Sequence, residues 1–409
     1  MKSIPQHIPM DQFEVQNNSL LIGGIEIPQL AEQIGQTPFY AYDRQLIKNR
    51  VQSLRDTLPT DIHLHYAIKA NPMPALVQLM TNLVDGFDLA SAGEMKTALD
   101  TEMARQHISF AGPGKTDKEL RQAIAAAIVI NIESDHEMER IAKFASEMNL
   151  TPKVAIRVNP DFELKASGMK MSGGPKQFGI DAEQVPSTLK RLTELKLDFY
   201  GFHIFSGSQN LNADSIIDAH NKTFELAYRL TEFAPRAPRL LNIGGGFGIP
   251  YFPGDTRLTI QPIADNLTRL LPAVKNKLPE AEIVIELGRY LVGEAGVYVC
   301  KVIDKKISRG ETFLISDGGL HHHLAASGNF GQVIRKNYPT CIGNKVTGEQ
   351  AQVNVVGPLC TPLDILANKM TLTQAEVGDL VVVFQSGAYG YTASPEKFLS
   401  HPPVIEVLV

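Results

Sequence analysis

DIHLHYAIKANP, at residues 61–72, is the stretch that decides the fold, because its side chains alternate in character. Successive side chains of an extended strand point to opposite faces. One face of this run carries Ile62, Leu64, Tyr66 and Ile68, and the other carries His63, His65, Ala67 and Lys69. The apolar face predicts packing against outer helices, and the polar face predicts the lumen of a barrel that holds a ligand.

Seven further runs of strand length follow, and stretches of helical period separate most of them. The eight runs are DIHLHYAIK (61–69), DGFDLAS (85–91), HISFAGP (107–113), AIVINIES (127–134), KVAIRVNP (153–160), FYGFHIFSG (199–207), LLNIGGG (240–246) and EIVIELGR (282–289). Strand followed by helix, repeated eight times, predicts a (β/α)8 TIM barrel. A doubly wound open sheet also alternates strand and helix and is the alternative, but eight units favour closure.

The fifth and sixth runs repeat the alternation seen in the first. In the fifth, Val154, Ile156 and Val158 oppose Lys153, Arg157 and Asn159. In the sixth, Tyr200, Phe202 and Ile204 oppose His203 and Phe205. We expect the first set of each run outside the barrel and the second set inside it.

After the eighth run the helical period fades, and strand-like runs separated by Gly, Pro and Asp turns take over. These runs predict a second, all-β domain, a sandwich or a small barrel. NNSLLIGGIEIP (17–28) near the start of the chain is expected to add a strand or two to it. We therefore expect an N-terminal segment at 1–40 that joins the β domain, the barrel at 41–290 and the β domain at 291–409.

Composition excludes several classes of protein for this chain of 409 residues. The 39 Lys plus Arg against 44 Asp plus Glu give a net charge of −5, which argues against a surface for nucleic acid or anionic membrane. Cys300, Cys341 and Cys360 are too far apart for a local disulfide framework or metal site, which favours the reducing cytoplasm. No signal core or membrane-spanning run is visible, so we expect a soluble protein with no membrane partner.

Reactive side chains stand where the predicted barrel strands end, which is where barrel enzymes place their active sites. Lys69 ends the first run, Asp88 the second, and Glu286 and Arg289 the eighth. A buried lysine readily loses its proton and forms Schiff bases. The alternative for Lys69 is a surface residue at the start of a loop.

The seventh run ends in Gly244, Gly245 and Gly246, whose backbone N–H groups can approach an anion closely. Barrels commonly bind phosphate after the seventh and eighth strands, and Arg289 adds a fork of donors there. The alternative is a tight turn with an ordinary salt bridge. A phosphate site together with an imine-forming lysine suggests pyridoxal phosphate as the cofactor.

Two other motifs carry less weight. Gly114-Lys115-Thr116 resembles the end of a phosphate-binding P-loop, but Ser109 stands where that motif needs its first glycine. We interpret it as a strand-to-helix turn capped by Thr116 or Asp117. For His321, His322 and His323 we expect polar contacts in a loop rather than a metal site, because adjacent side chains diverge in direction.

Eight motifs in order identify the chain as similar to the fold-type III pyridoxal-phosphate decarboxylases of the diaminopimelate and ornithine decarboxylase group. They are YAIKAN (66–71), GFDLASAGE (86–94), FHIFSGSQ (202–209), LNIGGGFG (241–248), ELGRYLV (286–292), DGG (317–319), GPLCTPLD (357–364) and SGAYG (386–390). The resemblance implies an N-terminal barrel, a C-terminal β domain and a homodimer with shared active sites.

The same resemblance implies roles for single residues. Lys69 would hold pyridoxal phosphate as a Schiff base, Glu286 would pair with the pyridine nitrogen, and Asp88 would lie near the Lys69 amine. The residues implied around the phosphate are Ser208, Gly244, Gly245, Gly246, Arg289 and Tyr389. Cys360 from the partner subunit would donate a proton after carbon dioxide leaves.

Departures from the family pattern concern the substrate. Diaminopimelate decarboxylases usually have two histidines where this chain has His203 and Phe205, so Phe205 is expected to stack on the cofactor. They usually place a glutamate after the cysteine to bind a distal amino group, where Thr361 stands here. We count as further substrate candidates Arg157, Asp317, Arg335, Tyr338 and Asp364.

The closer resemblance is to the subgroup of the butirosin-pathway decarboxylase, which acts on glutamate tethered to a carrier protein, and of the exosortase-associated decarboxylases. We therefore expect an α-decarboxylase of an amino acid or a carrier-bound aminoacyl group. The alternative is a decarboxylase of free meso-diaminopimelate. A racemase would place an arginine at the ring nitrogen instead of Glu286, and the presence of Lys69, Glu286 and Cys360 argues against an inactive regulator.

Overall fold

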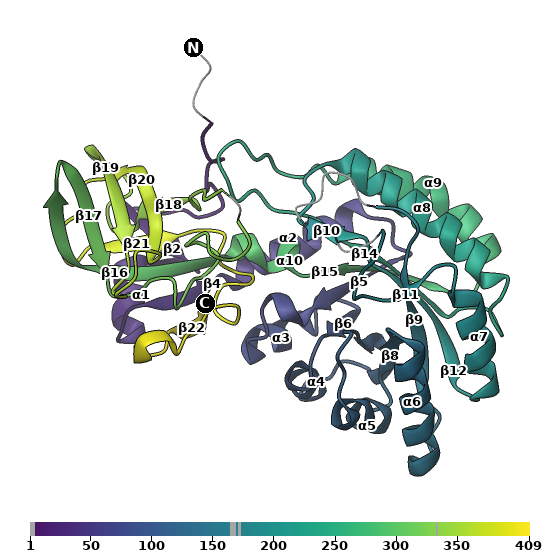
Figure 1. Ribbon diagram of the computed structural model, residues 1–409. Coiled ribbons are helices and arrows are strands. Elements are labelled where there is room, and N and C mark those ends of the chain that lie inside the picture. Colours follow the sequence, from purple (N-terminus) through teal and green to yellow (C-terminus); the bar gives the residue numbers. More distant parts are fainter. Residues whose placement is uncertain (1–4, 164–168, 171–172, 333) are drawn as a thin grey trace. The chain divides into compact units, whose positions relative to one another are not determined.

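A computed structural model describes residues 5–163, 169–170, 173–332 and 334–409 (Figure 1). Contacts within the chain divide it into two compact units. The barrel unit comprises the described residues of Val51–Gly248 and Leu258–Gly288. The β unit comprises the described residues of Met1–Arg50, Ile249–Arg257 and Arg289–Val409.

Eight parallel strands form a closed ring in the barrel unit. In ring order they are β5 (Ile62–Ala67), β6 (Gly86–Leu89), β7 (Ile108–Phe110), β8 (Val129–Ile132), β9 (Lys153–Asn159), β12 (Asp198–Ile204), β14 (Leu240–Gly245) and β15 (Glu282–Leu287). The ring closes because β15 pairs in parallel with β5, and Glu286 lies opposite His65 in that register. The predicted (β/α)8 barrel is confirmed, and the open-sheet alternative is wrong.

Helices follow the barrel strands and lie outside the ring (Figure 1). They are α3 (Pro74–Met80), α4 (Ala92–Leu99), α5 (Asp117–Ala125), α6 (Asp135–Met148), α7 (Val185–Glu194), α8 (Ala213–Thr231) and α9 (Gln261–Lys277). Thr116 caps α5 in a capping box with Glu119, which satisfies backbone N–H groups that the first turn leaves without partners. The interpretation of Gly114-Lys115-Thr116 as a capped turn is therefore confirmed.

The lower lumen of the barrel is filled by apolar side chains. Val129, Ala155, Leu240 and Val284 form a buried cluster, and the partly buried Tyr200 packs against it. We expected Tyr200 on the outer face with Phe202, and this prediction is wrong. The register between β12 and β9 shifts between Phe199 and Gly201, and such a bulge turns the side chain of the extra residue to the other face.

The β unit contains a small and a large sheet. β1 (Val15–Gln16), β2 (Ser19–Ile22) and β3 (Ile25–Glu26) form the small one. The large one contains β4 (Phe39–Tyr42), β16 (Gly296–Ser308), β17 (Glu311–Ser316), β18 (Thr340–Ile342), β19 (Gln350–Val356), β20 (Ile365–Thr373), β21 (Leu380–Val383) and β22 (Ile405–Leu408). The N-terminal strands and α1 (Ile27–Ile34) belong to this unit, as expected for residues 17–28.

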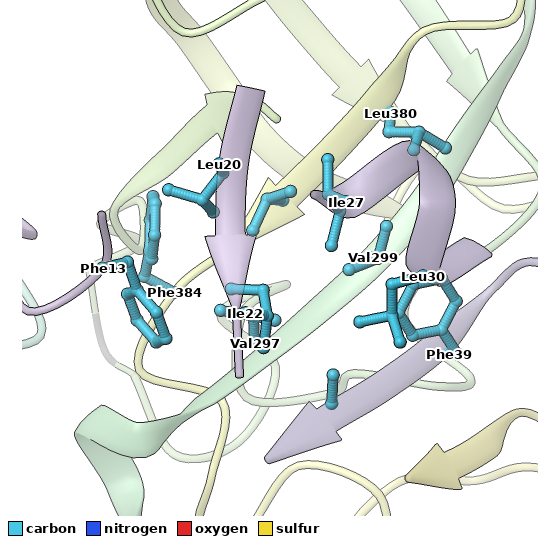
Figure 2. Packing of buried hydrophobic residues seen from close by; sticks show 12 residues of the cluster. Phe13, Leu20, Ile22, Ile27, Leu30, Phe39, Val297, Val299, Leu380 and Phe384 are labelled. Atoms are coloured by element: carbon cyan, nitrogen blue, oxygen red, sulfur yellow. The ribbon is translucent and has the colours of Figure 1, made fainter. Parts of the chain in front are cut away.

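One apolar cluster holds the N-terminal segment of the β unit onto the large sheet. Leu20, Ile22 and Ile27 come from β2 and α1, and they pack with Val297 and Val299 of β16 (Figure 2). Each such aliphatic side chain stabilises the fold by about 1.5–3 kcal/mol when it is fully buried. The N-terminal strands are thus part of the core of the β unit.

The compact units differ from the segments expected at 1–40, 41–290 and 291–409, because residues 41–50 and Ile249–Arg257 lie in the β unit. Where the domains divide stays a prediction. Among the described residues, no helix combines the length and apolar character needed to cross a membrane.

Candidate active site

Lys69 and Glu286 lie together where two paired barrel strands end. β5 leads into the short helix η1 (Ile68–Ala70), which carries Lys69, and β15 carries Glu286 near its end. Nζ of Lys69 lies 3.7 Å from Oε1 of Glu286. The lysine side chain is 40% exposed and the glutamate only 5%, so the amine is accessible and the carboxylate is fixed in the protein interior.

His203 approaches the same carboxylate from β12. Its Nε2 lies 3.1 Å from Oε2 of Glu286. Burial by itself raises the pKa of Glu286, but the polar contact with His203 and the positive charge of Lys69 outweigh it and lower the pKa to about 2. Glu286 is therefore an anion at neutral pH.

Phe205 follows His203 beyond the end of β12 and lies near the amine. Nζ of Lys69 is 5.6 Å from the centroid of the Phe205 ring. The His203 and Phe205 rings meet edge to face, with centroids 6.5 Å apart. The two side chains that the sequence placed on the lumen face thus surround the Lys69 and Glu286 pair.

A chain of polar contacts runs through the upper lumen from Asp88. Oδ2 of Asp88 lies 3.3 Å from Nδ1 of His65, and Oδ1 accepts a hydrogen bond from the Ser109 hydroxyl. Nδ2 of Asn131 donates to the Ser109 oxygen at 3.1 Å. These four buried residues come from β5, β6, β7 and β8, so the network fixes four neighbouring strand ends. Of these four residues, only Asp88 was predicted as a site residue, although Ser109 and Asn131 follow the polar alternation of their strands.

Arg157, a predicted substrate residue, is occupied by a protein contact. Its Nη1 donates to Oε1 of Glu133 at 2.7 Å, and both side chains are buried. Glu133 also accepts from the Gly112 and Gly179 N–H groups at 2.6 and 2.8 Å. Arg157 therefore organises the loops after β7 and β9, and its charge helps to lower the pKa of Glu286.

The triple glycine at the end of β14 has close neighbours at each position. Gly244 and Gly246 have φ of 70° and 74°, a left-handed conformation that glycine adopts without strain. A Cβ on Gly245 would lie 2.2 Å from the Glu286 carbonyl oxygen, and one on Gly246 would lie 2.3 Å from that of Gly207. The chain here passes so close to its neighbours that only glycine fits. Ser208, in the adjacent β13 (Gly207–Ser208), is half-buried.

In the β unit, Arg289 and Tyr389 form a pair. Cζ of Arg289 lies 4.7 Å from the centroid of the Tyr389 ring, and Nη1 donates to the Tyr251 hydroxyl at 2.8 Å. Nε of Arg289 is buried and has no hydrogen-bond partner among the described residues. A half-buried guanidinium with an unused N–H group fits an anionic ligand.

Cys360 lies exposed in a loop that the buried Asp364, four residues later, holds in place. Both oxygens of Asp364 accept backbone hydrogen bonds, Oδ1 from Leu320 at 2.6 Å and Oδ2 from Leu359 at 2.9 Å. Asp364 is 2% exposed, whereas Cys360 is exposed and Thr361 half-buried. The Asp364 carboxylate thus holds the loop through two backbone N–H groups, and its contact with substrate stays a prediction.

The other predicted substrate residues also have partners within the β unit. Asp317 accepts from the Thr37 hydroxyl and from the Lys301 N–H at 2.8 Å. Arg335 donates to the Ile365 carbonyl oxygen. Tyr338 is buried and its ring packs against Tyr251 at a centroid distance of 4.8 Å.

Of the three histidines, His322 and His323 make the polar loop contacts expected from the sequence, whereas both ring nitrogens of His321 are buried without a hydrogen-bond partner among the described residues. Nε2 of His322 lies 2.9 Å from the Pro402 carbonyl oxygen, and Nε2 of His323 lies 2.9 Å from the Ser386 hydroxyl. The His321 and His322 rings lie 3.7 Å apart. Burial lowers the pKa of His321 to about 3, so this imidazole is neutral.

The barrel residues fit pyridoxal phosphate. Among the described residues, Oε2 of Glu286, Oδ2 of Asp88, Oδ1 of Asn131 and both ring nitrogens of His203 are buried without an aligned hydrogen bond. Buried polar atoms of this kind need a partner, and a polar ring bound beside Glu286 supplies one. An accessible lysine, a permanent carboxylate and a glycine turn match the amine, ring-nitrogen and phosphate contacts that this cofactor requires.

Comparison with known proteins agrees with this fit. The family model for the pyridoxal-binding domain of pyridoxal-dependent decarboxylases matches residues 44–293. The chain is 38% identical over 390 residues to the L-glutamyl-[BtrI acyl-carrier protein] decarboxylase of Niallia circulans, covering 94% of this chain and 91% of that protein. It is 33% identical over 406 residues to the diaminopimelate decarboxylase of Aquifex aeolicus, covering 97% and 92%.

A solved structure shows the same fold over nearly the whole length. The diaminopimelate decarboxylase of M. jannaschii superimposes with a TM-score of 0.88 at 27% identity, covering 97% of this chain and 92% of that one. The family match and the similarity to these enzymes agree with the barrel site. The chain therefore belongs to the pyridoxal-dependent decarboxylases and is an enzyme that uses pyridoxal phosphate.

Proposed function

We propose that this enzyme removes the α-carboxyl group of an amino-acid unit that is extended by an acyl linkage, with a carrier-protein thioester or amide as the preferred form. The observation that carries the assignment of the site is the placement of Lys69 Nζ 3.7 Å from the buried Glu286 carboxylate. Lys69 would hold the cofactor through its amine, and Glu286 would pair with its ring nitrogen.

Bound pyridoxal phosphate supplies an electron sink for the electron pair that remains when carbon dioxide leaves. Glu286 keeps the ring nitrogen protonated, because it stays ionised at a pKa of about 2. His203 holds the Glu286 carboxylate in place, and Phe205 provides an apolar surface beside the ring. Asp88 contacts His65 and Ser109 and thereby fixes the polar side chains on the lumen side of the barrel.

We assign two sets of residues to the phosphate. The glycine turn at Gly244–Gly246 offers backbone N–H groups other than that of Gly244, which donates to Oδ1 of Asn242 at 2.8 Å, and Ser208 offers a hydroxyl. Arg289 and Tyr389 add a guanidinium and a phenol. The unused Nε–H of Arg289 supports this assignment, because a guanidinium N–H group binds a phosphate oxygen well.

Cys360 donates the proton that replaces the carboxyl group on the α-carbon, and solvent reprotonates the thiolate. We infer that it acts in a homodimer, in the site of the partner subunit. Cys360 is exposed in its own β unit, and Leu363 in the same loop is also exposed at 57%. Phe330 is 48% exposed, and Nδ2 of the adjacent Asn329 donates to the Leu363 carbonyl oxygen. A reactive thiol among exposed apolar side chains suits a subunit interface.

The preference for an extended substrate rests on the groups near Cys360. Thr361 carries no charge, and the carboxylates of Asp317 and Asp364 are already held by hydrogen bonds within the β unit. A distal ammonium group without an acidic partner would be costly to desolvate. Similarity to the enzyme of Niallia circulans, whose name describes a carrier-bound glutamyl substrate, supports the same choice. We keep Arg335 and Tyr338 as candidates for contact with the extended chain, although Arg335 donates to the Ile365 carbonyl oxygen and Tyr338 is buried in this structure.

The alternative is free diaminopimelate, the substrate named for the relative from Aquifex aeolicus. A carbon dioxide release screen separates the two, with free diaminopimelate, free glutamate and glutamyl carrier protein as substrates. Release from the carrier-bound substrate well above that from both free acids supports the proposal. Release from diaminopimelate alone contradicts it.

The three free thiols are compatible with work in the cytoplasm, which we propose as the location.

A further inference from the structure

His323 is a buried side chain of the β unit to which the proposed reaction gives no part. It is 0% exposed and follows β17 in the turn that contains the three histidines. Its backbone N–H donates to the Gly319 carbonyl oxygen at 3.0 Å, which fixes its place in that turn. A buried imidazole with both ring nitrogens in use is a specific feature, because an apolar residue would fill the same space without needing partners.

The hydrogen bonds of His323 define its tautomer. Nδ1 accepts a hydrogen bond from the Ala326 N–H at 3.2 Å, so it carries no proton. The proton of the neutral ring is therefore on Nε2, which donates to the Ser386 hydroxyl oxygen at 2.9 Å. Burial lowers the pKa of His323 to about 3, so the ring remains neutral in the working range of pH.

Ser386 connects His323 to the backbone around Tyr389. Its hydroxyl donates to the Val383 carbonyl oxygen at 2.8 Å, and its N–H donates to the Gly296 carbonyl oxygen at 2.9 Å. Three residues later, Tyr389 has φ of 54°, a left-handed conformation that a bulky side chain adopts only where its surroundings enforce it. The His323 and Ser386 hydrogen bond anchors the segment that leads to this residue.

A second route leads from His323 to Arg289 through aromatic rings. The His323 ring packs edge to face against Tyr338 at a centroid distance of 5.6 Å, and Tyr338 packs against Tyr251 at 4.8 Å. The Tyr251 hydroxyl accepts from Arg289 at 2.8 Å, and Arg289 lies 4.7 Å from the Tyr389 ring. The two routes from His323 thus meet at one pair of residues.

We propose that His323 is a positioning residue for the Arg289 and Tyr389 pair and thereby determines how strongly the enzyme selects a phosphorylated cofactor. This inference rests on the proposed function, which places that pair at the phosphate. His323 touches neither substrate nor cofactor in this account. It sets the Tyr389 backbone through Ser386 and the Arg289 guanidinium through Tyr338 and Tyr251.

The measurement is the ratio of two dissociation constants of the full-length enzyme, for pyridoxal and for pyridoxal phosphate. In His323→Phe the ring volume remains but both hydrogen bonds are lost, and we expect this ratio to fall about tenfold. His323→Gln should fall less, because its amide can still donate to Ser386. His322→Phe is the matched control, since the ring of His322 bonds to Pro402, and its ratio should equal that of the wild type.

Arg289→Ala separates failure of this inference from failure of the proposed function. If Arg289→Ala lowers the ratio and His323→Phe does not, or if His323→Phe weakens both ligands equally, the positioning role is wrong and the phosphate site stands. If Arg289→Ala leaves the ratio unchanged, the proposed phosphate site itself is wrong. Ser386→Ala removes the same hydrogen bond and replaces His323→Phe if that variant does not fold. If His323 acts through Arg289, adding His323→Phe to the Arg289→Ala variant should not lower the ratio below that of Arg289→Ala alone.

Discussion

Nε2 of His203 lies 3.1 Å from Oε2 of Glu286, on a carboxylate whose other oxygen lies 3.7 Å from Nζ of Lys69. The carboxylate is thus held between an imidazole and an ammonium group inside a barrel that would otherwise favour its protonation. This arrangement explains why the pKa of Glu286 falls to about 2 although the group is buried.

His203→Ala should raise the pKa of Glu286, because burial remains while the contact that opposes it is lost. A carboxyl group with a depressed folded-state pKa stabilises the protein above its unfolded pKa of about 4.3, and this stabilisation is lost as the pH falls through the folded pKa. The variant should therefore lose stability and activity at a higher pH than the wild type does. Urea unfolding and kcat/KM between pH 4 and 7 check this, with His203→Gln as the control that keeps a donor. Identical acid limbs in all three proteins would show that His203 does not hold Glu286.

The alternating pattern of the sequence was sufficient to predict the barrel and the core of its site. The alternation in DIHLHYAIK placed Lys69 on the lumen side, the end of the EIVIELGR run placed Glu286 at a neighbouring strand end, and the structure brings the two side chains together. The face on which Tyr200 lies was predicted wrongly, because a bulge changes the alternation of side chains along the strand. A single sequence carries no local signal for that bulge.

The substrate side was harder to predict, because the sequence does not reveal hydrogen bonds between distant loops. Asp364 and Asp317 look like free acids in GPLCTPLD and DGG, yet backbone N–H groups occupy Asp364 and contact Asp317. Arg157 looked available on its strand and is paired with Glu133, which lies at the end of the preceding strand.

Mixing two inactive variants tests the shared active site. Lys69→Ala lacks the cofactor lysine and Cys360→Ala lacks the proton donor, so a mixed dimer holds one intact site of two if the thiol acts across the interface. With random exchange half of the dimers are mixed, and activity should recover to about a quarter of the wild-type value. Fluorescence exchange between labelled subunits provides the control for mixing. No recovery despite exchange means that both residues act within one chain.

Thr361→Glu should shift the substrate preference toward diamino acids. The new carboxylate would give a distal ammonium group a charged partner, and we expect kcat/KM for free diaminopimelate to rise about tenfold or more relative to the carrier-bound substrate. Thr361→Gln has the same length without the charge and should not show this gain. An equal rise in both variants would assign the effect to side-chain size rather than to charge.

Borohydride reduction of the holoenzyme followed by peptide mapping tests the central claim most directly, because it locates the covalent bond between the protein and its cofactor. The structure offers a sharp comparison in Lys115, a second barrel lysine whose side chain is only 1% exposed and whose Nζ donates to Glu137 at 2.8 Å. Our account predicts that the purified protein is yellow, that the label appears on Lys69 alone, and that Lys69→Ala abolishes it. Label on Lys115 or on another lysine, or a protein that takes up no pyridoxal phosphate at all, would contradict the account.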